Sequence, residues 1–169
     1  GELEVVTNGI YDPETGMVTF STRHFSLYAV GYNKISFKDV PENAWYSKAV
    51  TFISARGIAT GIGDGNFSPE ANLTRGQFMV MLMKAYGIAP DPDTKDNFTD
   101  AGNTYYTGYL AAAKRLNITK GVGNNMFEPE RDITRQEMFT MLYNGLKAIG
   151  KLPEGTGGKP LSSFADADS

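Results

Sequence analysis

Two arginines, Arg75 and Arg135, are the residues of this chain best suited to binding chemistry. Each follows a threonine and lies two residues before Gln77 or Glu137, which completes the capping-box pattern of a helix start. Each guanidinium is therefore expected beside unpaired backbone N–H groups, which favour an anion. Because arginine binds carboxylates through two parallel hydrogen bonds, the pattern predicts a site for an acidic ligand. In the alternative, each arginine pairs with an acid of the protein and joins neighbouring segments. Capping is the simpler role for Gln77 and Glu137, although a groove at the helix start would also expose them.

Aromatic and acidic residues recur near the starts of two further helices. Trp45 and Tyr105 could each present an aromatic face to the C–H-rich side of a sugar ring. Core packing is the alternative, weighed equally for Trp45 and preferred for Tyr105. Asp39 and Asp100 each close a Phe-x-Asp motif shortly before these helices. Their simpler role is structural, as a cap of the helix or as the ion-pair partner of an arginine. The alternative is that they contact sugar hydroxyls.

The composition argues against several other kinds of site. The chain has no cysteine and a single histidine, His24, so thiolate metal sites, cysteine nucleophiles and a histidine relay within the repeats have no support. The loop 63–66 lacks the further ligands of a calcium loop, so a turn is the better interpretation. A formal net charge of −3 provides no broad basic field for nucleic acid or an anionic membrane. We therefore expect no catalytic residue, metal, cofactor, nucleic acid or membrane partner.

The residues that could bind a ligand are positioned by an internal repeat. Residues 58–82 and 118–142 are identical at ten of 25 positions, at a constant offset of sixty residues. Each copy predicts a compact loop rich in glycine and asparagine, followed by a second helix that starts at Thr74 or Thr134. The phenylalanine near the end of each loop is expected to plug the loop into the core.

The first helix of each copy is predicted over 44–57 and 105–116, where apolar residues recur on one face. Asn117 replaces Gly57 just after the helix, where a left-handed backbone suits glycine best and asparagine next. A helix, a tight loop and a second helix cannot shield their own apolar faces. We therefore expect neighbouring repeats to stack against each other.

The first 36 residues differ from the repeats. Strand-like runs at 3–6 and 17–21 flank a turn-rich break and predict a β-hairpin, and 24–32 predicts a third strand. Three strands without a second layer can hardly protect their faces and edges. We expect this segment to be the C-terminal strands of a preceding β-domain, or to pair with another chain.

The repeated motifs resemble the S-layer homology (SLH) repeat of bacterial cell-surface proteins. The resemblance is carried by Phe-x-Asp, the aromatic at the start of the first helix, Gly-x-Gly-(Asp/Asn)-x-x-Phe-x-Pro and (Leu/Ile)-Thr-Arg-x-(Gln/Glu), each present twice. It implies a mainly α fold, with three helix-loop-helix repeats around a pseudo-threefold axis and ligand grooves between neighbours. It divides the chain into the end of a β-domain (1–36), repeat 1 (37–87), a linker (88–97), repeat 2 (98–149), a linker (150–163) and the start of a truncated repeat 3 (164–169).

The same resemblance implies a noncatalytic, extracellular module of the bacterial cell wall. Its ligand would be a peptidoglycan-linked secondary cell-wall polysaccharide with anionic, commonly pyruvylated, sugars. The alternatives are a structural module that joins protein subunits and, with less weight, an accessory part of a surface glycosidase. The truncated third repeat leads us to expect self-association as dimers or trimers. The polysaccharide-binding residues would then be Arg75, Arg135, Trp45, Tyr105, Asp39, Asp100, Gln77 and Glu137.

Overall fold

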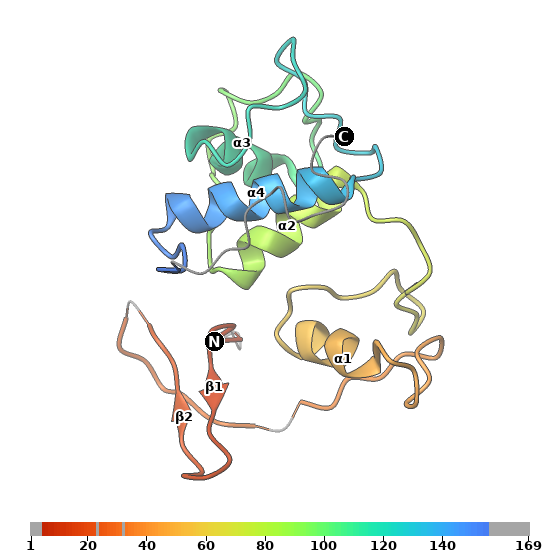
Figure 1. Cartoon of the computed structure of the whole chain (residues 1–169), viewed down its shortest axis with the longest axis vertical. Coiled ribbons are helices and arrows are strands. Elements are labelled where there is room, and N and C mark those ends of the chain that lie inside the picture. The colour runs from red at the N-terminus through yellow and green to blue at the C-terminus, as the bar shows by residue number, and fades with distance from the viewer. Residues whose placement is uncertain (1–4, 23, 32, 156–169) are drawn as a thin grey trace.

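The computed structural model describes residues 5–22, 24–31 and 33–155. This part of the chain is mainly helical, with four helices and one small antiparallel sheet (Figure 1). None of its helices combines the length and apolar character needed to cross a membrane. In chain order the elements are β1 (Ile10–Tyr11), β2 (Val18–Thr19), α1 (Ser47–Ala55), α2 (Arg75–Ala85), α3 (Thr107–Arg115) and α4 (Arg135–Ala148).

Both predicted capping boxes are present, at the starts of α2 and α4. The Thr74 hydroxyl accepts a hydrogen bond from the Gln77 N–H, and the Gln77 side chain accepts one from the Thr74 N–H. Thr134 and Glu137 make the same reciprocal pair. Each box satisfies two backbone groups that a helix start would otherwise leave without partners.

The first helix of each repeat ends as the sequence predicts. Gly57 follows α1 with φ = 68°, and Asn117 follows α3 with φ = 55°. The next residue in each repeat, Ile58 or Ile118, donates its N–H back into the last turn of the helix, at 3.0 and 2.9 Å. This left-handed ending gives a carbonyl group of the last turn a hydrogen-bond donor and turns the chain into the loop.

The core combines helices from both repeats. Helix α2 of repeat 1 packs against α3 and α4 of repeat 2, whereas α1 packs against none of the other helices (Figure 1). The expectation that repeats stack to cover their apolar faces is therefore met by α2, which completes the core of its neighbour. Residues of this cluster include Met79, Leu82, Met83, Phe98, Tyr106, Leu110, Ile118, Phe127 and Met141.

The N-terminal hairpin forms, but with a different first strand from the one expected at 3–6. A turn between Asp12 and Gly16 sets the register, which pairs β1 with β2 and ends where the Asn8 side-chain amide bonds the backbone of Ser21. Val5 and Val6 lie beyond this closure and form no strand. Residues 1–4 lie outside the described residues.

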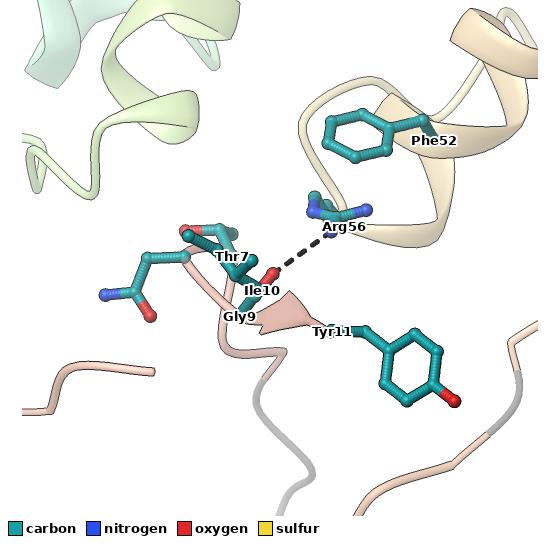
Figure 2. A pocket seen from close by; sticks show the side chains of 7 residues that line it. Thr7, Gly9, Ile10, Tyr11, Phe52 and Arg56 are labelled. Carbon is teal, nitrogen blue, oxygen red and sulfur yellow. Dashed lines mark hydrogen bonds between the residues drawn. The ribbon is translucent and has the colours of Figure 1, made fainter. Parts of the chain in front are cut away.

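The third strand expected at 24–32 is also wrong over its described part, because 24–31 contains no strand. A strand needs a partner for its backbone groups, and the ladder of β1 and β2 is only two residues long, too short to pair with a run of this length. The hairpin instead meets α1 through Arg56, whose Nη2 donates to the Gly9 carbonyl oxygen at 3.2 Å (Figure 2). The same guanidinium lies 3.6 Å from the centre of the Phe52 ring.

The predicted start of a third repeat at 164–169 lies outside the described residues.

Candidate functional site

Asp39 and Asp100 hold the loop of their own repeat. The two carboxylate oxygens of Asp39 accept hydrogen bonds from the N–H groups of Phe67 and Ser68, at 2.8 and 2.7 Å. Asp100 accepts from Phe127 and Glu128 at the same distances. Their default interpretation, as helix caps or arginine partners, is therefore corrected, because both oxygens are used by loop N–H groups. The Phe67 N–H bond lowers the pKa of Asp39 against the opposing effect of desolvation.

The two repeats meet at the N-terminus of α2. The N–H groups of Arg75 and Gly76 donate to the carbonyl oxygens of Arg131 and Pro129 of repeat 2, at 2.9 and 2.8 Å. The N–H groups expected to attract an anion at this helix start are therefore bonded to the second repeat. We call this contact between the start of α2 and residues 127–137 the seam.

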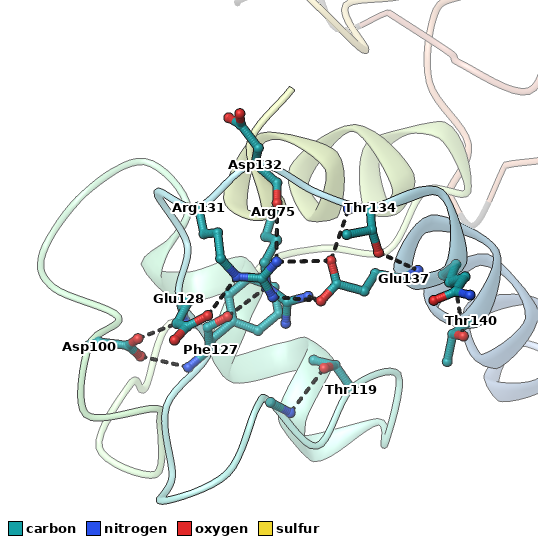
Figure 3. Close-up of polar contacts among 12 residues, drawn as sticks. Arg75, Asp100, Thr119, Phe127, Glu128, Arg131, Asp132, Thr134, Glu137 and Thr140 are labelled. Atoms are coloured by element: carbon teal, nitrogen blue, oxygen red, sulfur yellow. Dashed lines mark hydrogen bonds and ion pairs between the residues drawn. The ribbon is translucent and has the colours of Figure 1, made fainter. Parts of the chain in front are cut away.

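Arg75 is buried in the seam, with 2% of its surface exposed. Its Nε donates to the Phe127 carbonyl oxygen at 2.8 Å, and its Nη1 lies 2.5 Å from Oε1 of Glu137 (Figure 3). The guanidinium also lies over the Phe127 ring, 4.5 Å from its centre. The free guanidinium expected at Arg75 is thus not found, because the loop of repeat 2 covers it. Arg75 instead follows the alternative, in which the arginine pairs with an acid of the protein and joins neighbouring segments. The acid is Glu137 rather than the aspartate of a Phe-x-Asp motif.

Glu137 is the centre of a charge network in the seam. It caps α4, pairs with Arg75 and accepts from Nη2 of Arg131 at 2.6 Å, while Nε of Arg131 donates to Glu128. Although partial burial raises the pKa of Glu137, the Arg131 bond, the Thr134 N–H and the charge of Arg75 together lower it to about 2. Burial lowers the pKa of Arg75, and the charge of Glu137 opposes that effect.

Our sequence reasoning did not identify Arg131 or Glu128 as parts of this site. A signal was available, because the equivalent positions of repeat 1 hold the uncharged Ala71 and Ser68. Charges that appear in one copy of a repeat and not in the other mark positions where the two copies face different surroundings.

A groove of about 510 Å³ opens beside the seam, between α4 and the loop that follows α3. Arg75 and Glu137 line one part of it. The rest of its polar lining is hydroxyl, amide and ammonium groups, which suit the hydroxyls of a saccharide. These residues are Asn117, already expected at the end of α3, and Thr119, Lys120, Gln136, Thr140 and Asn144, which the sequence patterns did not single out.

Trp45 and Tyr105 are both exposed, at 93% and 62% of their surface. Each ring lies edge-on to the tyrosine that follows it, at centroid distances of 5.5 Å for Tyr46 and 5.1 Å for Tyr106. The core packing preferred for Tyr105 is corrected, because Tyr106 takes the buried position and bonds Glu130 with its hydroxyl. Neither exposed ring lines the groove.

Arg135 has the exposure that Arg75 lacks. It lies at the start of α4, 5.7 Å from the centre of the Phe139 ring, and has no ion pair among the residues that the structure describes. Gln136, the next residue, lines the groove. In the described part of the chain, no group of three acidic or histidine side chains is arranged to hold a metal ion.

Comparisons with known proteins match the two repeats. The model of the S-layer homology domain matches residues 36–79 and 97–139, which together are about half of the chain. The chain is 31% identical over 134 residues to an S-layer protein of Bacillus thuringiensis subsp. finitimus, covering 79% of this chain and 16% of that protein.

Two enzymes also match. An amylopullulanase of Thermoanaerobacterium thermosulfurigenes is 28% identical over 95% of this chain and 8% of its own length. An uncharacterized cell wall amidase of Bacillus anthracis is 32% identical over 71% of this chain and 23% of its own length. The chain thus spans less than a quarter of each of these three relatives. With two matched repeats and these relatives, the chain belongs to the S-layer homology family and is part of an extracellular protein attached to the bacterial cell wall.

Proposed function

We propose that this chain is a noncatalytic anchoring module that binds an anionic, pyruvylated secondary cell-wall polysaccharide in the groove beside the seam. The observation that carries the proposal is the range of its relatives. An S-layer protein, an amylopullulanase and a cell wall amidase differ in what their names say they do, yet share this short segment. What they have in common is better explained by attachment to the cell surface than by a reaction.

The use of the repeated acids supports a noncatalytic role. Asp39 and Asp100 hold loop N–H groups, and Glu137 caps α4 while it pairs with two arginines. A general acid or nucleophile needs a carboxylate that can reach the substrate, and these three are committed to the fold. If the chain were instead part of a surface glycosidase, it would release reducing sugar from wall polysaccharide, which a reducing-end assay measures.

The groove supports recognition of an acidic sugar. The exposed Gln136 offers an amide for the ring hydroxyls, and the ammonium group of Lys120 offers a partner for the acid. Thr119 and Asn144 already bond the Gly121 N–H and the Ile118 carbonyl oxygen, and add their remaining hydrogen-bonding capacity to the lining. Arg135 adds a second exposed cation next to Gln136. Trp45 and Tyr105 provide exposed aromatic faces on which further sugar rings of a long chain could pack.

Binding to purified wall polysaccharide, before and after removal of its acidic substituents, tests the proposal. We expect the native polymer to bind and the stripped polymer to bind at least tenfold more weakly, because a charge-assisted hydrogen bond contributes about 1.5–3 kcal/mol. Lys120→Ala and Arg135→Ala should weaken binding to the native polymer by a similar factor. Lys95→Ala, an equal change of charge on an exposed linker residue outside the groove, is the control. Equal binding of the two polymers would contradict an acidic ligand.

The outer face of α4 favours a second role in assembly. Phe139 and Tyr143 are 59% and 54% exposed, whereas their equivalents in α2, Met79 and Met83, are fully buried against repeat 2. Arg135 on this face is equivalent to Arg75 in the seam. We propose that α4 receives a third repeat in the way that repeat 2 receives α2, continuing a pseudo-threefold array, and that a second copy of the chain covers this face when no third repeat does.

Light scattering tests the assembly proposal. We expect the chain to form dimers or trimers that dissociate on Phe139→Ser with Tyr143→Ser, because these substitutions remove the apolar surface without disturbing the core. A monodisperse monomer at high concentration would refute self-association.

A further inference from the structure

The groove contains one guanidinium whose anion position is already filled. Oε1 of Glu137 lies 2.5 Å from Nη1 of Arg75 and also accepts from Nη2 of Arg131 at 2.6 Å. Both Arg75 and Glu137 line the groove. A carboxylate from a ligand that approached Arg75 would have to displace the carboxylate that the protein itself places there.

Repeat 1 shows that the helix cap does not require this carboxylate. Gln77, the equivalent of Glu137, completes the same capping box with an amide, and its Oε1 accepts from the Thr74 N–H at 3.0 Å. The corresponding bond of Glu137 is 2.9 Å. The negative charge of Glu137 is therefore an addition to the cap, and its partners are the two arginines of the seam.

The cations around Glu137 differ in what remains available to a ligand. Arg75 has its Nε bonded to the Phe127 carbonyl oxygen and its Nη1 paired with Glu137. Arg131 is paired with both Glu128 and Glu137. Lys120 lines the groove, is exposed and has no ion pair among the described residues. Lys120 is thus the cation of the groove that a ligand can reach without breaking a contact of the protein.

We propose that Glu137 is a built-in occupant of the anion position at Arg75, and that it excludes the acidic group of a ligand from this corner and directs it to Lys120. The exclusion of an acidic group from Arg75 depends only on contacts within the protein. The binding of the ligand's acidic group at Lys120 rests on the proposed function. Glu137 is then a positioning residue for ligand orientation, because it decides which cation of the groove the acid can meet.

Titration with acetate, followed by NMR, tests the exclusion without any polysaccharide. The Nε–H of Arg75 is buried and hydrogen-bonded, so its resonance reports on the guanidinium directly. In the unmodified chain we expect acetate, at constant ionic strength, to leave this resonance unmoved. In Glu137→Gln, where the amide keeps the cap but no longer places a negative charge at Arg75, we expect acetate to shift the resonance. We also expect acetate, at ten times its dissociation constant for Glu137→Gln, to raise the midpoint of thermal unfolding of this variant by about 3–5 °C.

Glu42→Gln, an equal change of charge on an exposed residue before α1, is the matched control and should respond to acetate as the unmodified chain does. Acetate that shifts the Arg75 resonance in the unmodified chain would overturn the proposal, since the position would then be open. A resonance unmoved by acetate in folded Glu137→Gln would also overturn it, because Arg75 would then not attract an anion even without the charge of Glu137. If Glu137→Gln does not fold, the unmodified chain alone still decides whether acetate reaches Arg75.

Lys120 is tested separately with the wall polysaccharide. We expect Lys120→Ala to lose at least tenfold in affinity for the acidic polymer and nothing for the stripped polymer. If Lys120→Ala binds the acidic polymer as well as the unmodified chain does, the direction to Lys120 is wrong. Failure of the unmodified chain to bind any wall polymer would instead remove the proposed function, and the acetate result at Arg75 would stand independently.

Discussion

The second helix of repeat 1 and the second helix of repeat 2 have related sequences and opposite surroundings. Met79 and Met83 of α2 are buried in the core of repeat 2, whereas the equivalent Phe139 and Tyr143 of α4 lie exposed. Arg75 is sealed in the seam, while Arg135 is exposed. The difference shows that the face of α2 is covered by the next repeat, so the sequence repeat and the packed unit of this chain are not the same segment.

The loops of the two repeats can be compared in the same way. They share a backbone conformation but differ in the polarity of the side chains around them. Both loops are held by an aspartate and both follow a left-handed residue. Yet the groove residues Thr119, Lys120 and Gln136 of repeat 2 correspond to Ala59, Thr60 and Gly76 of repeat 1. The fold is repeated, and the polar lining that could bind a saccharide is a property of repeat 2.

The largest expected effect is the difference in stability between alanine substitutions of Arg75 and Arg135. Arg75→Ala should lower the free energy of unfolding by about 3–5 kcal/mol, because it removes one member of a buried ion pair and its bond to Phe127. Arg135→Ala should change it by less than about 0.5 kcal/mol, because the side chain is exposed. Urea unfolding of both variants measures the difference. Equal effects would mean that the seam does not stabilise the chain.

Acid should weaken the seam through Glu137. Its pKa is about 2 in the folded chain against an ordinary value of 4.5, so the unfolded chain binds more protons between these pH values. The resulting stabilisation, about 3 kcal/mol, is complete above pH 4.5 and is lost as the pH falls through 2. Urea unfolding at pH 3 and pH 6 should show a smaller difference for Glu137→Gln than for the unmodified chain. Parallel pH profiles would argue against this origin of the acid sensitivity.

Alanine substitutions of Gly61 and Gly121 test whether the two loops are equally intolerant of a side chain. They have φ of 76° and 77°, and an added Cβ would overlap the carbonyl oxygen of Asn66 or Met126. Alanine at either position should therefore destabilise its loop by about 1–3 kcal/mol. Thermal unfolding measures the loss. A neutral substitution in repeat 1 alone would show that its loop rearranges freely, unlike the loop of repeat 2.

The smallest expected effect is at the helix ends. Asn117→Gly should raise the free energy of unfolding by a few tenths of a kcal/mol or leave it unchanged, because Asn117 already tolerates φ = 55°. Gly57→Asn should lower it by a similar amount. Chemical unfolding with both variants in parallel measures the pair. Losses of more than about 1 kcal/mol would mean that the two positions are not equivalent.

Local features of the fold could be predicted because they depend on neighbouring residues. The capping boxes at Thr74 and Thr134 and the left-handed Asn117 depend on bonds within one turn of the chain. The strand expected at 3–6 is wrong over its described residues, 5–6, because its pairing depended on where the turn before Gly16 set the register. The candidate site was only partly predictable, since the sequence identified Arg75 and Glu137 but not that they face each other.

The sequence by itself determined that the chain has two equivalent helix-loop-helix repeats, where the first helix of each repeat ends and the second begins, and which family they resemble. Those properties follow from short-range hydrogen bonding and from a motif present twice. Only the tertiary structure decided that Arg75 is buried on Glu137 while Arg135 stays exposed, because equivalent residues acquire different roles when one repeat has a neighbour on that side and the other has none among the described residues.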